Sequence, residues 1–363
     1  MTYAHYIAGE WVTDDAVSIN INPSNIDDIV GEFSRGDAAR VDEAVAAANA
    51  AQPDWAAASP QLRHDVLEKA SNLITSRKDE LGRLLSREEG KTLAEGIGET
   101  MRAAQVFKFF AGEAIRNVGD AVASIRPGID VTVEREAVGT IGLITPWNFP
   151  IAIPAWKLAP ALAYGNAVVM KPAELTPGCA WELAKILHEA GCPTGVFNLV
   201  MGPGSTVGAR IVEHPGIDAI SFTGSVATGN TIAVQCASTG KRVQMEMGGK
   251  NPLVVVDDAD LDVAVATAIN GAFFSTGQRC TASSRLIVTA GIHDAFLEKL
   301  TSAAANLIVG DALDAATQIG PVVDQKQLDQ NLRYLKLASN EGCDVRGGEL
   351  ANGPGFFMKP AIF

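Results

Sequence analysis

The chain has 363 residues, of which 47% are hydrophobic and 20% are charged, and its formal net charge is −13. This length exceeds one average domain, so we expect at least two substructures around a large core. The acidic excess and the lack of any basic block argue against nucleic acid as a partner. No signal pattern and no apolar run of the ~20 residues that a membrane helix needs is found, which predicts a cytoplasmic protein.

The first part of the chain is predicted to be helical. Residues 37–58 are rich in alanine. Ser59 and Pro60 look like a helix N-cap followed by proline at the first helical position. Apolar residues then recur at helical spacing over 62–74, and a third helical run is expected over 99–116.

From residue 118 onward the pattern changes to strands. Residues 122–138 alternate around Pro127 and Gly128, which predicts a hairpin. Short apolar runs then alternate with helical ones such as 179–190 and 263–274, which predicts an α/β fold with parallel sheets and right-handed crossovers. The expected strands are 140–145, 167–170, 196–200, 219–222, 243–246, 253–256 and 286–289.

The last segment, 353–363, is apolar and strand-like, with no polar tail. Chains usually end in exposed, polar residues. We therefore expect a fragment, or a last segment that pairs with something absent.

Cysteine and histidine usage predicts no disulfide framework and no metal site. The five cysteines include no Cys-x-x-Cys pair, and the five histidines share no metal-like spacing. Four of the thiols are expected to be buried and reduced. The cysteines are Cys179, Cys192, Cys236, Cys280 and Cys343.

Cys280 differs from the other cysteines in its surroundings. It is flanked by small residues, and Arg279 precedes it. A thiol attacks as its thiolate, which a nearby cation stabilises, and Gly277 leaves room for a ligand. Upstream, Glu246 ends the apolar-leaning strand 243–246. A thiol and a carboxylate are the two groups that a covalent thioester mechanism needs.

Two glycine-bearing turns follow expected strands. Gly224 and Ser225 lie between a strand and a helix, where backbone N–H groups attract phosphate. Residues 202–208, which end in Gly208, nearly match the Gly-x-Gly-x-x-Gly fingerprint. One such turn is more often an ordinary tight turn, but two at strand ends favour a dinucleotide site.

Two further turns carry polar side chains. Lys171 and Glu174 follow the strand 167–170 and could bind the ribose of an adenosine, although a solvated loop pair explains them as well. Asn148 lies between two aromatic residues and two prolines. It is a candidate oxyanion donor, although an asparagine in a turn more commonly bonds its own backbone.

Together these segments resemble the aldehyde dehydrogenase superfamily over the whole chain. The motifs stand in family order: Pro-Trp-Asn-Phe-Pro at 146–150, Lys-Pro-Ala-Glu at 171–174, Phe-Thr-Gly-Ser at 222–225, Glu-x-Gly-Gly-Lys at 246–250 and Gly-Gln-x-Cys at 277–280.

The resemblance implies three substructures. These are a Rossmann-type dinucleotide-binding domain (1–120 and 139–247), an oligomerisation hairpin (121–138) and an α/β catalytic domain (248–363). The last is expected to be incomplete, because the family continues with a Glu-x-Phe-Gly-Pro motif that this sequence lacks.

The resemblance also implies catalytic roles. Cys280 resembles the nucleophile that attacks the aldehyde, with the oxyanion held by Asn148 and the Cys280 N–H. Glu246 resembles the general base that activates water to release the acid.

The expected cofactor is NAD or NADP, and Glu174 should repel a 2′-phosphate. The implied partners are the aldehyde and, as a homodimer or homotetramer, further copies of the chain. The residues that resemble the cofactor site are Trp147, Lys171, Glu174, Gly208, Gly224 and Ser225.

Extended segments around the motifs resemble the 2-oxoglutarate semialdehyde (2,5-dioxopentanoate) dehydrogenase branch. The succinate semialdehyde branch has an arginine where Trp156 stands. A substrate carboxylate needs a cation, and Arg102 is the candidate, although a surface arginine is equally expected. Phe149 and Trp156 are the other candidate substrate contacts.

Three alternatives remain. A CoA-acylating dehydrogenase needs no water-activating carboxylate at 246. A cysteine hydrolase needs a histidine base, and no histidine lies in these motifs. A truncated chain could also be an inert structural protein, although it keeps Cys280, Asn148 and Glu246.

Overall fold

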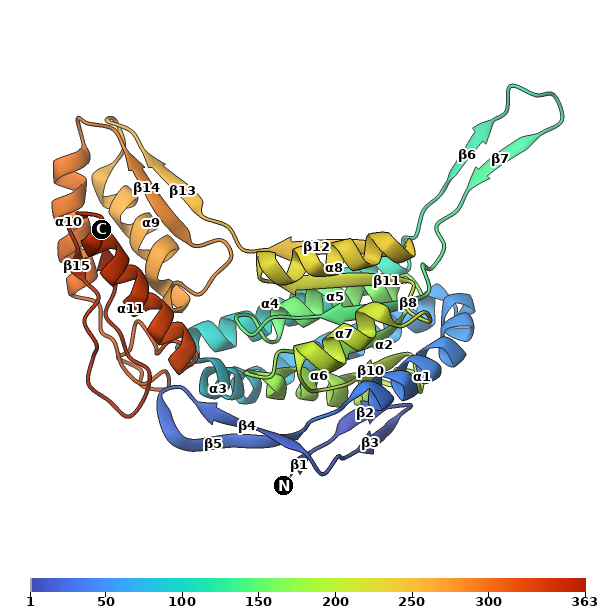
Figure 1. Ribbon diagram of the computed structural model, residues 1–363. Helices are drawn as coiled ribbons and strands as arrows, with labels where there is room; N and C mark the ends of the chain where they lie inside the picture. The colour runs from blue at the N-terminus through green and yellow to red at the C-terminus, as the bar shows by residue number, and fades with distance from the viewer. Residues whose placement is uncertain (1) are drawn as a thin grey trace. The chain divides into compact units, whose positions relative to one another are not determined.

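The computed structural model describes residues 2–363, which form two compact units (Figure 1). Unit 1 contains the residues up to 18 together with 32–81 and 99–246. Unit 2 contains 19–31, 82–98 and 247–363.

Unit 1 is built on a seven-stranded sheet with the order β12-β11-β8-β9-β10-β2-β3. Strands β8 to β11 are parallel, while β2 pairs antiparallel with β10 and with β3. The strands are β2 (His5–Ile7), β3 (Glu10–Val12), β8 (Thr140–Ile144), β9 (Ala167–Lys171), β10 (Phe197–Leu199), β11 (Ala219–Gly224) and β12 (Arg242–Met247).

Both faces of this sheet are covered. All five residues of β9 are buried, although successive side chains of a strand point to opposite faces. On one face, Ala167 and Val169 join a core with helices α1 (Ala38–Ala57) and α7 (Ala209–Glu213). Helix α5 (Ala152–Ala163) also contacts β8 and β9, and α6 (Pro177–Ala190) contacts β10. A parallel sheet buried on both faces explains why these strands appear in the sequence as continuous apolar runs.

Two helices of unit 1 begin at side-chain caps, and the cap at Ser59 is the one that the sequence predicted. Asp37 accepts from the N–H groups of Ala39 and Arg40 at the start of α1, and Ser59 accepts from Leu62 N–H at the start of α2. The elements are α1 (Ala38–Ala57), α2 (Pro60–Ser76), α5 (Ala152–Ala163), α6 (Pro177–Ala190), the π-helix η1 (Gly204–Gly208), α7 (Ala209–Glu213) and α8 (Val226–Thr239).

Some elements contribute residues to both units. They are β4 (Val17–Asn22), β5 (Asn25–Ser34), α3 (Lys78–Glu89), α4 (Leu93–Ala114) and, by its last residue Met247, β12. Strand β5 lies between β4 and β1 (Thr2–Tyr3) in a three-stranded sheet.

The predicted hairpin is formed by β6 (Asp120–Ala123) and β7 (Asp130–Val133), which pair antiparallel. Every residue of the two strands is exposed. Figure 1 shows the hairpin extending away from the rest of unit 1.

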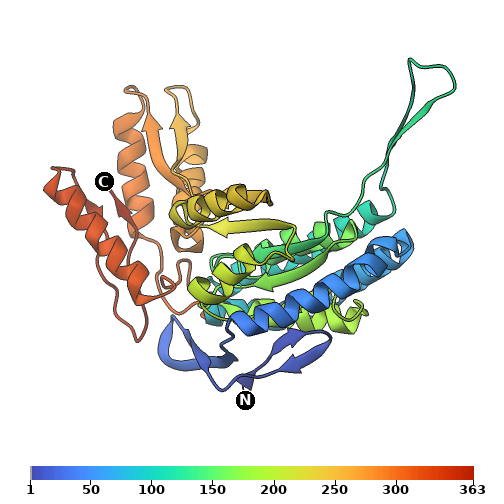
Figure 2. The same ribbon diagram turned by 45° about the vertical axis from the view of Figure 1, so that its right-hand side comes forward.

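Unit 2 contains the parallel pair β13 and β14, with α9 and α10 packed together beside it (Figure 2). Its elements are β13 (Asn251–Val255), α9 (Leu261–Phe273), the 3₁₀ turn η2 (Phe274–Gly277), β14 (Ser283–Val288), α10 (His293–Ala305), α11 (Gln325–Asn340), β15 (Arg346–Gly347) and β16 (Ala361–Ile362).

The alternation of strands and helices expected from residue 140 is confirmed. The sequence pattern missed the N-terminal strands and helices α3, α5, α10 and α11. Helix α5 carries two prolines, Pro154 in its first turn and Pro160 in its interior, which hid its helical character. One expectation about thiols was wrong: Cys343 is exposed, because it follows the turn that ends α11. In the part of the chain that the structure describes, no helix has the length and apolar character to cross a membrane.

Candidate active site

A cavity of about 530 Å³ lies in unit 1 between η1, α7 and α8. Ile144, the last residue of β8, borders it. Strand order reverses between β8 and β11, because the chain runs from β8 to β9 and β10 and then returns to β11 on the other side of β8. Such switch points are where open α/β sheets bind ligands. The lining includes Gly204, Ser205, Gly208, Thr228, Thr231 and Gln235.

Two predicted cofactor residues form the start of α8. Ser225 is the N-cap and accepts from Thr228 N–H at 3.3 Å. Gly224 precedes it, and a Cβ there would lie 2.5 Å from the ring of the buried Phe222. Glycine is therefore required, and it leaves the helix N-terminus open to an anionic group.

Lys171 and Gly208 are neighbours in the structure. The Lys171 side chain is 5% exposed, and its amine donates to the carbonyl of Pro172 at 2.6 Å. Burial lowers the pKa of Lys171 to about 8, and the charge of Glu174 partly offsets this. A Cβ on Gly208 would contact the Lys171 stem at 3.4 Å. The predicted partner Glu174 is exposed and lies 3.8 Å from Arg35.

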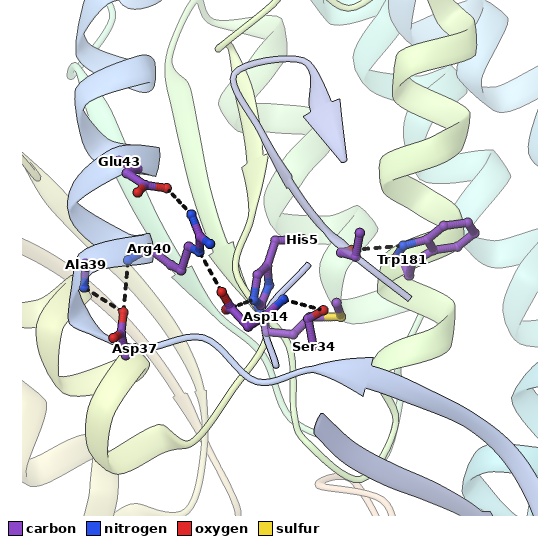
Figure 3. A network of polar contacts seen from close by, with 10 residues as sticks. His5, Asp14, Ser34, Asp37, Ala39, Arg40, Glu43 and Trp181 are labelled. Atoms are coloured by element: carbon purple, nitrogen blue, oxygen red, sulfur yellow. Dashed lines mark hydrogen bonds and ion pairs between the residues drawn. The ribbon is translucent and has the colours of Figure 1, made fainter. Parts of the chain in front are cut away.

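The turn before η1 is held by a buried histidine (Figure 3). His5 is fully buried, and its Nδ1 accepts from Met201 N–H at 3.1 Å. Its Nε2 is therefore the protonated nitrogen and donates to Asp14 at 2.9 Å, and Asp14 also accepts from Arg40 at 2.8 Å. Burial lowers the pKa of His5, with Asp14 opposing the change. Sequence analysis missed this network, because its members are far apart in the chain.

Asn148, the candidate oxyanion donor, lies in the turn between β8 and α5. Thr176 donates to the carbonyl of Trp147 at 3.3 Å, and the buried carboxylate of Glu99 accepts from Ile151 N–H at 3.2 Å and from Ala152 N–H at 3.1 Å. Because Ile151, the N-cap residue of α5, makes no side-chain cap hydrogen bond, Glu99 supplies the acceptor that the helix start needs.

Glu246, the candidate base, is exposed near the end of β12, and Gln244 donates to it at 2.9 Å. The amine of Lys157, a residue 8% exposed, donates to Gln244 at 3.2 Å and to Ser221 at 2.7 Å. Burial lowers the pKa of Lys157 to about 8, and the charge of Glu246 opposes this. Sequence analysis missed Lys157 as a candidate site residue. The signal that could have found it is that it is the one charged residue in the apolar run 151–163.

Cys280 is exposed and belongs to unit 2. Its carbonyl accepts from the Asn251 side chain at 2.8 Å. The neighbouring Arg279 donates to the carbonyl of Asn270, and burial lowers the pKa of this guanidinium while the charge of Glu95 raises it. The predicted catalytic residues are thus divided, with Asn148 and Glu246 in unit 1.

The substrate candidates are surface residues in the structure. Arg102 is exposed on α4, Trp156 is 47% exposed on α5, and Phe149 is partly buried in the preceding turn. Within residues 2–363, no group of His, Cys, Asp and Glu side chains could hold a metal ion.

Comparison with known proteins decides the family. The model of the "Aldehyde dehydrogenase family" matches residues 11–363. The chain belongs to the aldehyde dehydrogenase family. The family and the oxidoreductase class expected from the motifs are therefore confirmed.

Among curated family members, the chain is 42% identical to the alpha-ketoglutaric semialdehyde dehydrogenase of Bacillus subtilis strain 168, over 100% of this chain and 76% of the relative. It is 42% identical to the alpha-ketoglutarate semialdehyde dehydrogenase of Haloferax volcanii, over 99% and 76%. It is also 39% identical to the betaine aldehyde dehydrogenase of Bacillus subtilis, over 100% and 76%.

Solved structures of the family share the fold, which confirms the expected α/β architecture. An E. coli NADP-dependent enzyme matches with a TM-score of 0.96 and 37% identity, over 99% of this chain and 75% of that one. The betaine aldehyde dehydrogenase of Staphylococcus aureus in complex with NAD+ matches with a TM-score of 0.96 and 34% identity, over 99% and 73%.

Proposed function

We propose that this dehydrogenase oxidises an aldehyde that carries a carboxylate, such as 2-oxoglutarate semialdehyde, to the free acid with NAD or NADP. The observation that carries the proposal is the hydrogen-bonded series from Lys157 through Gln244 to Glu246. A carboxylate that is positioned by a hydrogen bond, as Glu246 is by Gln244, suits a base that activates water to hydrolyse a thioester. Transfer of the acyl group to the thiol of CoA needs no such base.

The cofactor site fits a dinucleotide. The cavity of about 530 Å³ at the switch point, the open N-terminus of α8 and the glycines beside Lys171 offer space, backbone donors and an ammonium group. The residues proposed to hold the cofactor are Trp147, Lys171, Glu174, Gly208, Gly224 and Ser225. When bound, the nicotinamide accepts a hydride.

The protein residues supply the remaining chemistry. We assign Cys280 as the thiolate that adds to the carbonyl carbon, and the Asn148 amide as a donor to the resulting oxyanion. Loss of hydride leaves a thioester on Cys280. Glu246 then removes a proton from water, which attacks the thioester and releases the acid with the free thiol.

Two groups of relatives are named for aldehydes of opposite charge. The relatives at 42% identity are named for an anionic semialdehyde, and those at 39% for betaine aldehyde, which is cationic. Exposed Arg102 favours an anionic substrate. Trp156 and Phe149 are aromatic residues that could face a quaternary ammonium, which makes betaine aldehyde the second candidate.

We also propose a homodimer or homotetramer assembled through the β6–β7 hairpin. Its apolar side chains are exposed in the single chain, including Val122 at 52% and Val133 at 49%. Light scattering would test this. A monomer at micromolar concentration would contradict it.

Cofactor reduction tests the function. The chain is assayed with NAD and NADP against 2-oxoglutarate semialdehyde, succinate semialdehyde and betaine aldehyde, with and without CoA. We expect the free acid from the first substrate and no activity in Cys280→Ser. Acyl-CoA as the main product, turnover without cofactor, or undiminished oxidation by Cys280→Ser would each refute the mechanism.

A further inference from the structure

The backbone just before Cys280 adopts a conformation that its residues disfavour. Ser275, Thr276 and Gly277 have φ of 54°, 55° and 66°, three consecutive residues in the left-handed region. Glycine adopts it freely, but serine rarely does, and a β-branched threonine is a genuine outlier there. Such conformations persist only where surrounding contacts impose them, and they concentrate at functional sites.

Glu95 provides the contacts that hold this run. Its Oε1 accepts from Ser275 N–H at 2.7 Å and from the Ser275 hydroxyl at 3.3 Å. Ser275 is 7% exposed, so its N–H would be left without a partner if the carboxylate were removed. Thr276 is held separately, because its hydroxyl donates to the carbonyl of Gly320 at 3.1 Å.

The other oxygen of Glu95 fixes the carboxylate itself. Oε2 accepts from Thr92 N–H at 3.1 Å and from the Thr92 hydroxyl at 2.9 Å, and Glu95 N–H donates back to that hydroxyl at 3.4 Å. This reciprocal pair is a capping box at the start of α4. The oxygen that accepts from Ser275 therefore belongs to a side chain fixed in the first turn of a helix of 22 residues.

We propose that Glu95 is a positioning residue for the Cys280 thiol, acting by imposing the left-handed run at Ser275–Gly277. The inference rests on the proposed role of Cys280 as nucleophile. Without Glu95 the run relaxes toward ordinary backbone conformations, and Gln278 to Cys280 shift with it. The charge of Glu95 also favours the charged form of the half-buried Arg279 beside the thiol.

The test compares Glu95→Ala, Glu95→Gln and the control Glu113→Ala, which removes an ion-paired carboxylate from the last part of the same helix. We expect Glu95→Ala to lower kcat by about tenfold or more with KM nearly unchanged, because small misplacements of a reacting group are costly. Glu95→Gln keeps one acceptor oxygen, which can still meet Ser275 N–H, but its NH2 group replaces the oxygen that accepts from Thr92 N–H. It should therefore lose less of kcat than Glu95→Ala, and Glu113→Ala should retain most of kcat.

Alkylation of Cys280 by iodoacetamide, followed by peptide mass spectrometry, reports on the thiol without cofactor or substrate. Exposed Cys343 is an internal reference in every sample. Glu95→Ala should change the Cys280 rate several-fold and leave the Cys343 rate unaltered. The double variant Glu95→Ala/Ser275→Asn should recover part of the loss, because asparagine adopts the left-handed region more readily than serine. If Glu95→Ala does not fold, the double variant is compared with wild type in its place.

The outcomes separate this inference from the proposed function. If Cys280→Ser oxidises aldehydes at the wild-type rate, the proposed function fails, whatever Glu95 does. If Cys280→Ser is inactive while Glu95→Ala keeps the wild-type kcat and Cys280 alkylation rate, only the role of Glu95 is overturned. Equal losses in Glu95→Ala and the double variant would also overturn it.

Discussion

The carboxylate of Glu99 on α4 accepts a hydrogen bond from the backbone N–H of Ile151, the N-cap residue of α5, which lies three positions after Asn148. A second bond from Ala152 N–H goes to the same oxygen. The turn that carries the candidate oxyanion donor is thus tied at its end to a buried acidic side chain.

Glu99→Ala should therefore loosen this turn. We expect a stability loss of about 1–2 kcal/mol, typical of a lost helix cap, and a kcat about tenfold lower, because a displaced oxyanion donor stabilises the transition state less. Glu99→Gln keeps an acceptor and should lose far less. Urea unfolding and steady-state kinetics measure both effects. Equal kcat values in Glu99→Ala and wild type would contradict the prediction.

Lys157 should give the protein a pH-dependent stability. Its pKa is about 8 in the folded chain and 10.5 when exposed, so the unfolded state binds more protons between these values. Stability from this group therefore rises with pH from 8 to 10.5, by up to about 3 kcal/mol. Unfolding of wild type and Lys157→Met at pH 7 to 10 should show the gain only in wild type. Exposed Lys108→Met is the control, and parallel wild-type and Lys157→Met curves would refute the prediction.

His5 links the N-terminal strand β2 to the turn at Met201 that precedes η1. His5→Ala should raise the KM for the cofactor several-fold and leave the KM for the aldehyde unchanged, at a stability cost of about 1–3 kcal/mol for the orphaned groups. The exposed His293→Ala is the matched control. An unchanged cofactor KM would show that the turn at Met201 keeps its conformation without His5.

His5 should also make the stability of the protein depend on pH in the acidic range. Because burial lowers the folded-state pKa of His5 below 6.5, the unfolded chain takes up the proton first. The stability contributed by neutral His5 is present above pH 6.5 and is lost as pH falls through the folded-state pKa. Unfolding midpoints from pH 7 to 5 should fall more steeply in wild type than in His5→Ala, and equal slopes would contradict this.

Glu174 is predicted to discriminate between cofactors. Its carboxylate lies 3.8 Å from Arg35, and both side chains are at least 39% exposed, so this pair contributes little to stability. Glu174→Gln should improve kcat/KM for NADP relative to NAD by about tenfold, since a like charge near the 2′-phosphate is removed. Glu213→Gln serves as a control, and an unaltered ratio would argue against contact with the ribose.

Arg102 is the residue to test for substrate charge. Arg102→Met should raise the KM for a carboxylated aldehyde far more than for a neutral one, because only the former loses an ion pair. Steady-state kinetics with 2-oxoglutarate semialdehyde and an aliphatic aldehyde would measure it. Equal effects on both would remove Arg102 from the substrate site.

The sequence alone determined the family and the strand–helix alternation. It also identified the candidate catalytic and cofactor-binding residues. Cys280 was singled out by its immediate neighbours, and Gly224 with Ser225 by their place between a strand and a helix. These signals are local, because a few consecutive residues are enough to indicate a turn, a helix cap or an apolar strand.

Only the tertiary structure showed which distant residues hydrogen-bond to the segments around these candidate residues. Glu95 and Ser275 are 180 positions apart, and His5 and Met201 are 196 apart. Nothing in the local pattern marks a glutamate as an acceptor for a distant backbone N–H. Folding brings these groups together because a buried donor must find a partner, and which partner it finds depends on packing over the whole unit.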